Sequence, residues 1–166
     1  MINSCSLRPL TENDLAMVLS WRNEPAVRAV MFNRHEIGMD EHRDWFATAS
    51  RDETRRLLLV EEAGVPIGYV QFANVRPGGV SDWGFYATPS ARKGTGRRLG
   101  AAALNHAFGA LGLHKVCGQA LASNTASIRM HCALGFCQEG ILRQHHPIDD
   151  RHEDVICFGL LSHEWD

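Results

Sequence analysis

The sequence contains no CxxC pair and no long apolar run, and each absence removes a class of protein. Its five cysteines stand at positions 5, 117, 132, 137 and 157, a scattered spacing that fits reduced thiols better than a disulfide framework or a zinc site. No apolar stretch approaches the roughly 20 residues of a membrane helix. The first ten residues, MINSCSLRPL, lack the apolar segment of a secretory signal. We therefore expect a cytoplasmic protein with no membrane span and no metal.

An excess of positive charge is also missing. The chain has 17 Lys and Arg against 19 Asp and Glu, a formal net charge of −2, so nothing points to nucleic acid and any anion site must be local. The composition is otherwise that of a soluble globular protein, and 166 residues suit one compact domain. No repeat or linker divides the chain. We expect a single domain over residues 1–166, acting as a monomer or homodimer.

Hydrophobic periodicity and turn signals predict an α/β fold with a mixed sheet. Helices are expected after Thr11, over 26–32, from Asp40 to residue 50, and over 96–111 and 124–134. Strands are expected over 6–10, 56–61, 66–73, 80–88, 114–121, 137–143 and 154–161. The strand over 80–88, the loop after it and the helix over 96–111 form a crossover near the centre of the sheet.

The first candidate site is the segment YATPSARKGTGRR at residues 86–98. A strand ends, glycines allow a ligand close to the backbone, and a helix begins, so free N–H groups and the helix dipole form an anion site. Four basic side chains accompany it: Arg92, Lys93, Arg97 and Arg98. The alternative is a glycine-rich turn with a solvated basic surface. The spacing is neither the Rossmann nor the P-loop pattern.

The second candidate site is the helix that follows residue 123. Asn124 is positioned to cap the helix and Gly135 to end it. Asn124, Ser127 and His131 stand at i, i+3 and i+7, so they share one helix face. This polar stripe suggests a site, although a solvent-facing stripe is the commoner meaning of such a pattern.

Together the two segments resemble the GNAT acetyltransferase superfamily. That family has an acetyl-CoA loop of the form (Q/R)xxGx(G/A), matched here by Gly94 and Gly96, and a later helix matched by Asn124, Ser127 and the Gly135–Phe136 pair. The resemblance covers nearly the whole chain. It implies a mostly antiparallel sheet of about seven strands with flanking helices, and acetyl-CoA as the co-substrate. The expected acetyl-CoA contacts are Phe85, Tyr86, Arg92, Lys93, Gly94, Thr95, Gly96, Arg97, Asn124 and Ser127.

Two positions depart from the family pattern. Ala91 stands where the loop usually has Gln or Arg, and Arg92 follows one place later. His131 stands where many relatives have a tyrosine thought to protonate the departing thiolate, so His131 is the candidate acid. Asp82, acting through water, is the candidate base. The resemblance implies direct attack by the amine, with a strand N–H near Gly84 binding the thioester carbonyl, and Gly84 is expected to mark a β-bulge.

The N-terminal region suggests the acceptor. The pattern LRxL…D…WRNxPxV, with EHxxWF at residues 41–46, is similar to ribosomal-protein-type acetyltransferases. With WGFY at residues 83–86 it is most similar to the nucleotide-sugar N-acetyltransferases of pseudaminic acid synthesis. These act on the 4-amino group of UDP-4-amino-4,6-dideoxy-N-acetyl-β-L-altrosamine. The resemblance implies that a UDP-sugar contacts Arg22, His42, Trp45 and Tyr86, and a guanidinium suits its pyrophosphate.

Three other functions remain open at this point. One is acetylation of a protein N-terminus, which needs a groove for an extended peptide. Another is acetylation of an aminoglycoside, a polycation that prefers an acidic pocket such as one formed by Asp149, Asp150, Glu153 and Asp154. The last is a non-catalytic acyl-CoA-binding module, which keeps the glycine loop and lacks an amine site.

Overall fold

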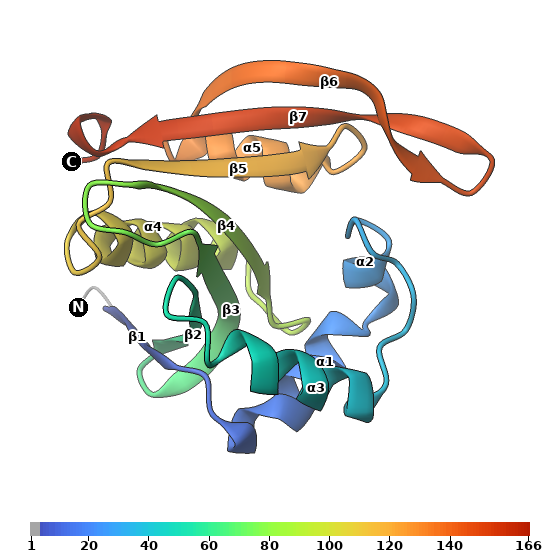
Figure 1. The fold of residues 1–166 in the computed structure, drawn as a ribbon, viewed down its shortest axis with the longest axis horizontal. Helices are drawn as coiled ribbons and strands as arrows, with labels where there is room; N and C mark the ends of the chain where they lie inside the picture. Colours follow the sequence, from blue (N-terminus) through green and yellow to red (C-terminus); the bar gives the residue numbers. More distant parts are fainter. Residues whose placement is uncertain (1–3) are drawn as a thin grey trace.

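A seven-stranded sheet organises the computed structural model, which describes residues 4–166 (Figure 1). The sheet has the order β1-β2-β3-β4-β5-β7-β6. Its strands are β1 Cys5–Pro9, β2 Arg56–Glu62, β3 Val65–Ala73, β4 Val80–Ala87, β5 Lys115–Leu121, β6 Cys137–Ile148 and β7 Arg151–Leu161. The α-helices are α1 Leu15–Arg22, α2 Pro25–Arg28, α3 Met39–Ala49, α4 Thr95–Phe108 and α5 Thr125–Ala133, and the 3₁₀ turns are η1 Glu12–Asp14 and η2 Ser162–Glu164.

One strand pair in this sheet is parallel, and the other five are antiparallel. The parallel pair is β4 and β5, which α4 connects as a crossover helix. Its register covers only Val80↔Lys115, Ser81↔Val116 and Asp82↔Cys117, after which the two strands separate. The prediction of a mixed, mostly antiparallel sheet of about seven strands is confirmed.

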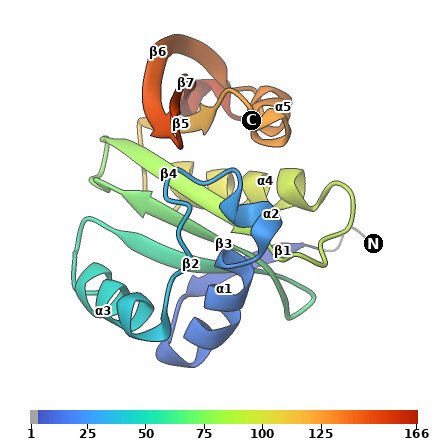
Figure 2. The same cartoon turned by 90° about the vertical axis from the view of Figure 1, so that its right-hand side faces the viewer.

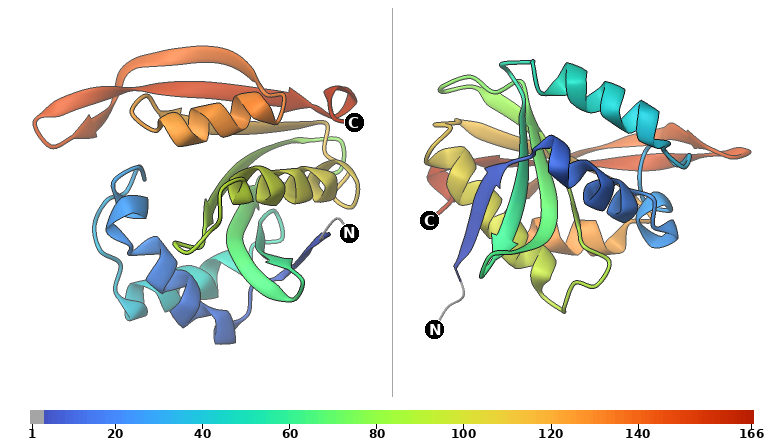
Figure 3. Two further views of the ribbon diagram at one scale, coloured as in Figure 1. Left: turned by 180° about the vertical axis from the view of Figure 1, so that it is seen from behind. Right: turned by 90° about the horizontal axis from the view of Figure 1, so that it is seen from below.

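The helices cover both faces of the sheet. Helices α1 and α3 lie on one face of β1–β4, and α4 lies on the opposite face (Figure 2). Helix α5 lies against β5, on the same side as α4 (Figure 3). Because both faces of β2 are covered, residues 57–60 are all apolar. Leu58 and Val60 pack in the core under α4, whereas Leu57 and Leu59 pack in the core under α1 and α3. A strand buried on both faces is apolar at consecutive positions.

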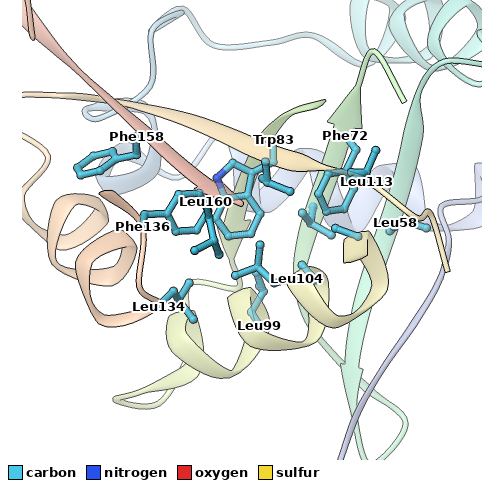
Figure 4. Packing of buried hydrophobic residues seen from close by; sticks show 14 of the residues in the cluster. Leu58, Phe72, Trp83, Leu99, Leu104, Leu113, Leu134, Phe136, Phe158 and Leu160 are labelled. Atoms are coloured by element: carbon cyan, nitrogen blue, oxygen red, sulfur yellow. The ribbon is translucent and has the colours of Figure 1, made fainter. Parts of the chain in front are cut away.

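The larger core lies between the sheet and helices α4 and α5. Figure 4 shows Leu99 and Leu104 of α4 packed toward Trp83, with Phe136 beside the indole ring. The rings of Trp83 and Phe136 are stacked, with centroids 5.2 Å apart. Trp83 therefore belongs to the core and, at the same time, to the point where β4 leaves β5.

The C-terminal strands are longer than the sequence predicted. We expected strands over 137–143 and 154–161, but β6 and β7 continue to Ile148 and back from Arg151 as one long hairpin. Most of the added residues are polar and exposed, so they lack the apolar alternation that marks a strand; Ile148 and Glu153 are the buried exceptions. Register shifts between Leu142 and His146 interrupt the pairing. Backbone pairing with β7 extends this strand, and Ile148 at its end packs with Leu121 and Val155.

The N-terminal helices also differ from the prediction. The helix expected over 26–32 ends at Arg28, and α3 is preceded by Gly38 rather than capped by Asp40. The segment 29–38 is instead irregular and held by side chains that donate to its carbonyl groups. Arg22 donates to Asn33, Asn23 to Ile37, and Arg28 to Arg34. These bonds replace helical ones, and they place the segment beside the candidate site.

None of the helices within residues 4–166 has both the length and the apolar character needed to cross a bilayer.

Candidate active site

A cavity of about 740 Å³ opens where β4 and β5 separate. Its walls come from four segments: α2 and the chain after it, β4 with the loop that follows, β5, and α5. Seven of the predicted site residues line it, namely Asp82, Phe85, Tyr86, Gly96, Asn124, Ser127 and His131. The fold thus brings together the two segments that the sequence separated by about one α–β unit.

The loop before α4 has the conformation that the glycine pattern predicts. Gly94 has a φ of +87°, a left-handed conformation that favours glycine. The backbone N–H groups of Gly96 and Arg97 donate to no protein acceptor in the described part of the chain, so they are free to bind an anion. Thr95 differs from the prediction. Its N–H donates to the Arg92 carbonyl, so that N–H is not free for the cofactor, whereas its hydroxyl accepts from Arg98 and keeps its own proton to donate.

The basic side chains of this loop divide into two groups. Arg92, Lys93 and Arg97 are exposed and lie outside the cavity lining. Arg98 is engaged by Glu62, with 2.8 Å between Nε and Oε1. Three free cations beside an open helix N-terminus fit the pyrophosphate of acetyl-CoA, and the uncovered edge of β4 fits its amide-bearing arm.

The free edge of β4 has a different origin from the one we predicted. Gly84 marks no bulge, because β4 pairs with β3 in unbroken register from Asp82↔Ala73 to Ala87↔Gly68. Instead, β4 has no partner on its other side after Asp82, where β5 turns away. Strand N–H groups thus become available through divergence of the strands.

Asp82 lies at the inner end of the cavity, in the last residue pair that joins β4 to β5. Its carboxylate is exposed and accepts a hydrogen bond of 3.3 Å from the Asn74 side chain. Alternation along the strand places Asp82 on the same side as Tyr86 and opposite Trp83. The carboxylate therefore faces the side of the sheet that carries α1 and α3. Its role as the base remains a prediction.

His131 is 1 % exposed, and both of its ring nitrogens have protein partners. The Trp83 indole N–H donates to Nε2 at 3.1 Å, and Nδ1 lies 2.8 Å from the Ser127 carbonyl oxygen. A carbonyl can only accept, so Nδ1 carries the proton and Nε2 has the lone pair. Burial lowers the pKa of His131, although the bond to Ser127 opposes this effect. The acid role remains a prediction, and this geometry does not favour it.

A second cavity, of about 230 Å³, adjoins the first and shares Met31, Gln71 and Tyr86 with it. The four residues predicted to bind the acceptor all line this cavity: Arg22 from α1, His42 and Trp45 from α3, and Tyr86 from β4. The rings of His42 and Trp45 are stacked with centroids 5.2 Å apart. The fold therefore brings these four residues, from three elements, into one pocket, which we call the acceptor pocket after that prediction.

The polar groups of the acceptor pocket are buried and partly unpaired. Arg22 is 6 % exposed, and its Nη1 has no hydrogen-bond partner, nor has Nε2 of His42. Burial lowers the pKa of His42, so this ring is neutral near pH 7. Burial also raises the pKa of Tyr86, which keeps its hydroxyl protonated. A buried polar group without a partner is costly, so both orphan atoms require a ligand or water.

Sequence reasoning missed about half of the acceptor pocket. Tyr69 and Gln71 come from β3, and Gln71 is a polar side chain within an otherwise apolar strand, which was a usable signal. Met31, Asn33 and Ile37 come from the irregular segment after α2. No local pattern predicts their position, because long-range side-chain bonds hold that segment.

The cysteines and acidic side chains of residues 4–166 form neither a disulfide nor a metal site. All five cysteines are free. Within residues 4–166, no group of three His, Cys, Asp or Glu side chains is placed to hold a metal ion.

The glycine loop yields a prediction about cofactor affinity. A Cβ at Gly96 meets only Met130 Sδ, at 3.5 Å, so the fold tolerates a side chain there, but its branches fill the cavity wall. We expect Gly96→Val to raise the Kd for acetyl-CoA by at least about tenfold, measured by calorimetry. Gly140→Val is the matched control, because nothing lies within 4 Å of a Cβ there. Equal affinity in both variants would remove the loop from the cofactor site.

The buried histidines yield a prediction about stability. The pKa values of His42 and His131 lie below the 6.5 of a free imidazole, so below that pH the unfolded chain binds more protons than the folded one. We expect the free energy of unfolding to fall as the pH is lowered from about 7.5 to about 5.5. Urea denaturation across this range measures it. His131→Gln removes one titrating group and should flatten the slope; an unchanged slope would contradict the assignment.

Comparison with known proteins agrees with this geometry. A family model described as an acetyltransferase (GNAT) domain matches residues 5–137. Spermidine N(1)-acetyltransferase of Vibrio cholerae is 26% identical over 168 residues, covering 99% of this chain and 97% of the relative. Acetyltransferase PseH of Campylobacter jejuni is 23% identical over 131 residues, covering 79% and 82%. An L-methionine sulfoximine/L-methionine sulfone acetyltransferase of Pseudomonas aeruginosa is 29% identical over 147 residues, covering 85% of each chain.

The fold has close counterparts among solved structures. The crystal structure of the Vibrio cholerae spermidine N-acetyltransferase in complex with CoA and spermine matches with a TM-score of 0.88 over 97% of both chains, at 24% identity. At that identity the match shows a shared fold, and the family model, which spans most of the sequence, shows the family. The chain belongs to the GNAT acetyltransferase family and is an N-acetyltransferase that uses acetyl-CoA.

Proposed function

We propose that the acceptor is the primary amine of a nucleotide sugar, of the UDP-4-amino-4,6-dideoxy-N-acetyl-altrosamine type. The observation that carries this proposal is the pair of orphan atoms in the acceptor pocket, Arg22 Nη1 and His42 Nε2. The guanidinium offers an N–H to a phosphate or carbonyl oxygen, and the neutral imidazole offers a lone pair to a hydroxyl. A sugar attached to a diphosphate has both kinds of group.

The charge of the pocket supports an anionic acceptor over a polycation. Arg22 is the buried charge of the acceptor pocket. Glu41 also lines the pocket, but its carboxylate lies 2.8 Å from the ring of His35 and is partly satisfied there. Bringing a second cation beside a buried guanidinium costs Coulomb energy that solvent screens poorly. Trp45 and Tyr86 supply the aromatic surface for a base or a sugar ring.

The chemistry requires the acceptor amine to attack in its neutral form. Bound acetyl-CoA supplies an activated acetyl group. The uncovered edge of β4 offers N–H groups to a carbonyl oxygen that gains negative charge. Asp82 lies at the inner end of the same cavity, where its carboxylate can take the amine proton through water. Tyr86 lines both cavities. The amine therefore passes Tyr86 on its way from the acceptor pocket to the acetyl group.

A polyamine is the second candidate acceptor. Two observations favour it: the relative from Vibrio cholerae is a spermidine acetyltransferase, and Glu41 places a carboxylate in the pocket lining. A polyamine needs several carboxylates along its length. The acidic residues of the β6–β7 hairpin lie outside the acceptor pocket lining, which weakens this candidate.

The proposed acceptor predicts that Arg22 contributes to binding of the UDP-amino-sugar and not to binding of acetyl-CoA. Arg22→Ala should raise the KM for the UDP-amino-sugar about tenfold or more, because a hydrogen bond to a charged group is lost. The Kd for acetyl-CoA should change little. Thiol release, measured with the UDP-amino-sugar and with spermidine, tests this. Arg51→Ala, an exposed arginine outside both cavities, is the matched control.

Two outcomes would overturn the assignment. One is turnover of spermidine with none of the UDP-amino-sugar. The other is a loss of acetyl-CoA affinity in Arg22→Ala, which would move Arg22 to the cofactor site. Urea denaturation of the variant separates either result from misfolding.

The base assignment predicts a selective effect on turnover. Asp82→Asn keeps the size of the side chain and removes its basicity, so kcat should fall by about 100-fold while the Kd for acetyl-CoA is kept. Asp150→Asn, in the exposed turn between β6 and β7, is the control. A wild-type kcat in Asp82→Asn would assign proton removal to solvent.

A further inference from the structure

We propose that Trp83 and His131 form a side-chain tether that sets the separation of β4 and β5 at the inner end of the cavity. In this role His131 is a positioning residue, and water gives the departing thiolate its proton. The inference rests on acetyl transfer from acetyl-CoA and is independent of which amine is the acceptor.

The tether lies where the backbone ladder ends. Asp82↔Cys117 is the last pair between β4 and β5, and the next residues on the two strands are Trp83 and Gly118. Ladder hydrogen bonds hold strands about 4.8 Å apart, and beyond this pair nothing of that kind fixes the distance. The first side-chain hydrogen bond beyond the ladder joins β4 to α5, the helix that packs on β5: the Trp83 indole N–H donates to His131 Nε2 at 3.1 Å.

Gly118 leaves the space through which the tether passes. A Cβ built on Gly118 would lie 2.7 Å from Trp83 Nε1 and would also clash with His131 Nε2. The two rings therefore meet directly over the backbone of β5. An alanine at this position would push the rings apart. The glycine, the indole and the imidazole form one unit, drawn from β4, β5 and α5.

The surroundings hold the imidazole in one orientation. Its ring is stacked on Phe158 with centroids 4.7 Å apart and planes 9° from parallel, and the Phe136 ring meets its edge. On the other side, Nδ1 bonds the Ser127 carbonyl in the preceding turn of α5. Every polar atom of the ring is therefore committed to the protein. No titratable side chain makes a hydrogen bond to it in the described chain.

These contacts conflict with proton donation to a thiolate. A donor at Nε2 needs a proton where the Trp83 N–H already points, so the two hydrogens would face each other. A donor at Nδ1 would point at a backbone carbonyl of its own helix, where the Ser127 oxygen at 2.8 Å already takes the proton. The tether instead needs the neutral ring with its lone pair on Nε2, and burial favours that form.

Three substitutions distinguish the two roles. In His131→Gln the amide oxygen can take the place of Nε2 and accept from Trp83, but the amide cannot donate a proton to a thiolate near neutral pH. His131→Phe removes the acceptor. Trp83→Phe removes the donor and leaves His131 intact. The measurements are the Kd for acetyl-CoA by calorimetry, and kcat with the amine that the wild type acetylates fastest among the UDP-amino-sugar and spermidine.

The tether predicts that His131→Phe and Trp83→Phe each raise the Kd for acetyl-CoA about tenfold, because a buried partner is lost and the cavity wall shifts. His131→Gln should restore most of this affinity and most of kcat. An acid role predicts the opposite pattern: His131→Gln and His131→Phe lose kcat equally, Trp83→Phe keeps it, and the Kd values stay near wild type. That pattern would overturn the proposal.

One measurement on the wild-type protein needs no variant to fold. Nitrogen-15 NMR of the His131 ring, with and without CoA, reports which nitrogen carries the proton. We expect the neutral ring with its proton on Nδ1 from about pH 7 to about pH 8. Protonation of Nε2 within that range would refute the tether. Because acetyl-CoA affinity and this spectrum do not involve the acceptor, the tether can fail while the nucleotide-sugar assignment stands, and the reverse.

Discussion

The separation of β4 from β5 is the constraint on which the rest of the site depends. Two parallel strands joined by a crossover helix form a continuous ladder in most sheets, and here the ladder stops after three residue pairs. Helix α4 packs Leu99 and Leu104 toward Trp83 on one face of the sheet, and α5 lies against β5 on that same face. An unpaired strand edge is a liability in most proteins, because it can pair with another chain. In this fold the same edge lines a cavity and can pair with a ligand.

The two cavities differ in charge and in the elements that line them. The cavity between β4 and β5 begins at a helix N-terminus with exposed cations, which suits a pyrophosphate. The acceptor pocket is formed mainly by α1, α3 and the irregular segment between them, and its buried charge is Arg22. Tyr86, Gln71 and Met31 form the wall that the two share. Since the second pocket depends on a segment held by side-chain bonds to backbone carbonyls, the acceptor preference can change without altering the cofactor site.

His131 shows how a family position can keep its place and change its chemistry. The motif places it on the face of α5 with Asn124 and Ser127, and all three line the same cavity. The tyrosine of many relatives has one polar atom at the end of a ring, whereas an imidazole has two within its ring. Here both ring nitrogens are hydrogen-bonded within the protein, Nε2 to the Trp83 indole and Nδ1 to the Ser127 carbonyl. The position on the helix follows from the sequence, and the partners follow from packing.

The sequence alone determined the order of the elements, the mixed sheet and the glycine loop before α4. These depend on local signals: apolar periodicity, turn residues, and a glycine where φ is positive. The tertiary structure decided how far β6 and β7 extend, because their added residues are mostly exposed and pair through the backbone, with Ile148 buried at the end. It also decided that the Thr95 N–H is bonded to the Arg92 carbonyl and that the edge of β4 is free without a bulge. The acceptor pocket and the orientation of His131 required the folded chain, since their polar atoms find partners, or lack them, only across residues far apart in sequence.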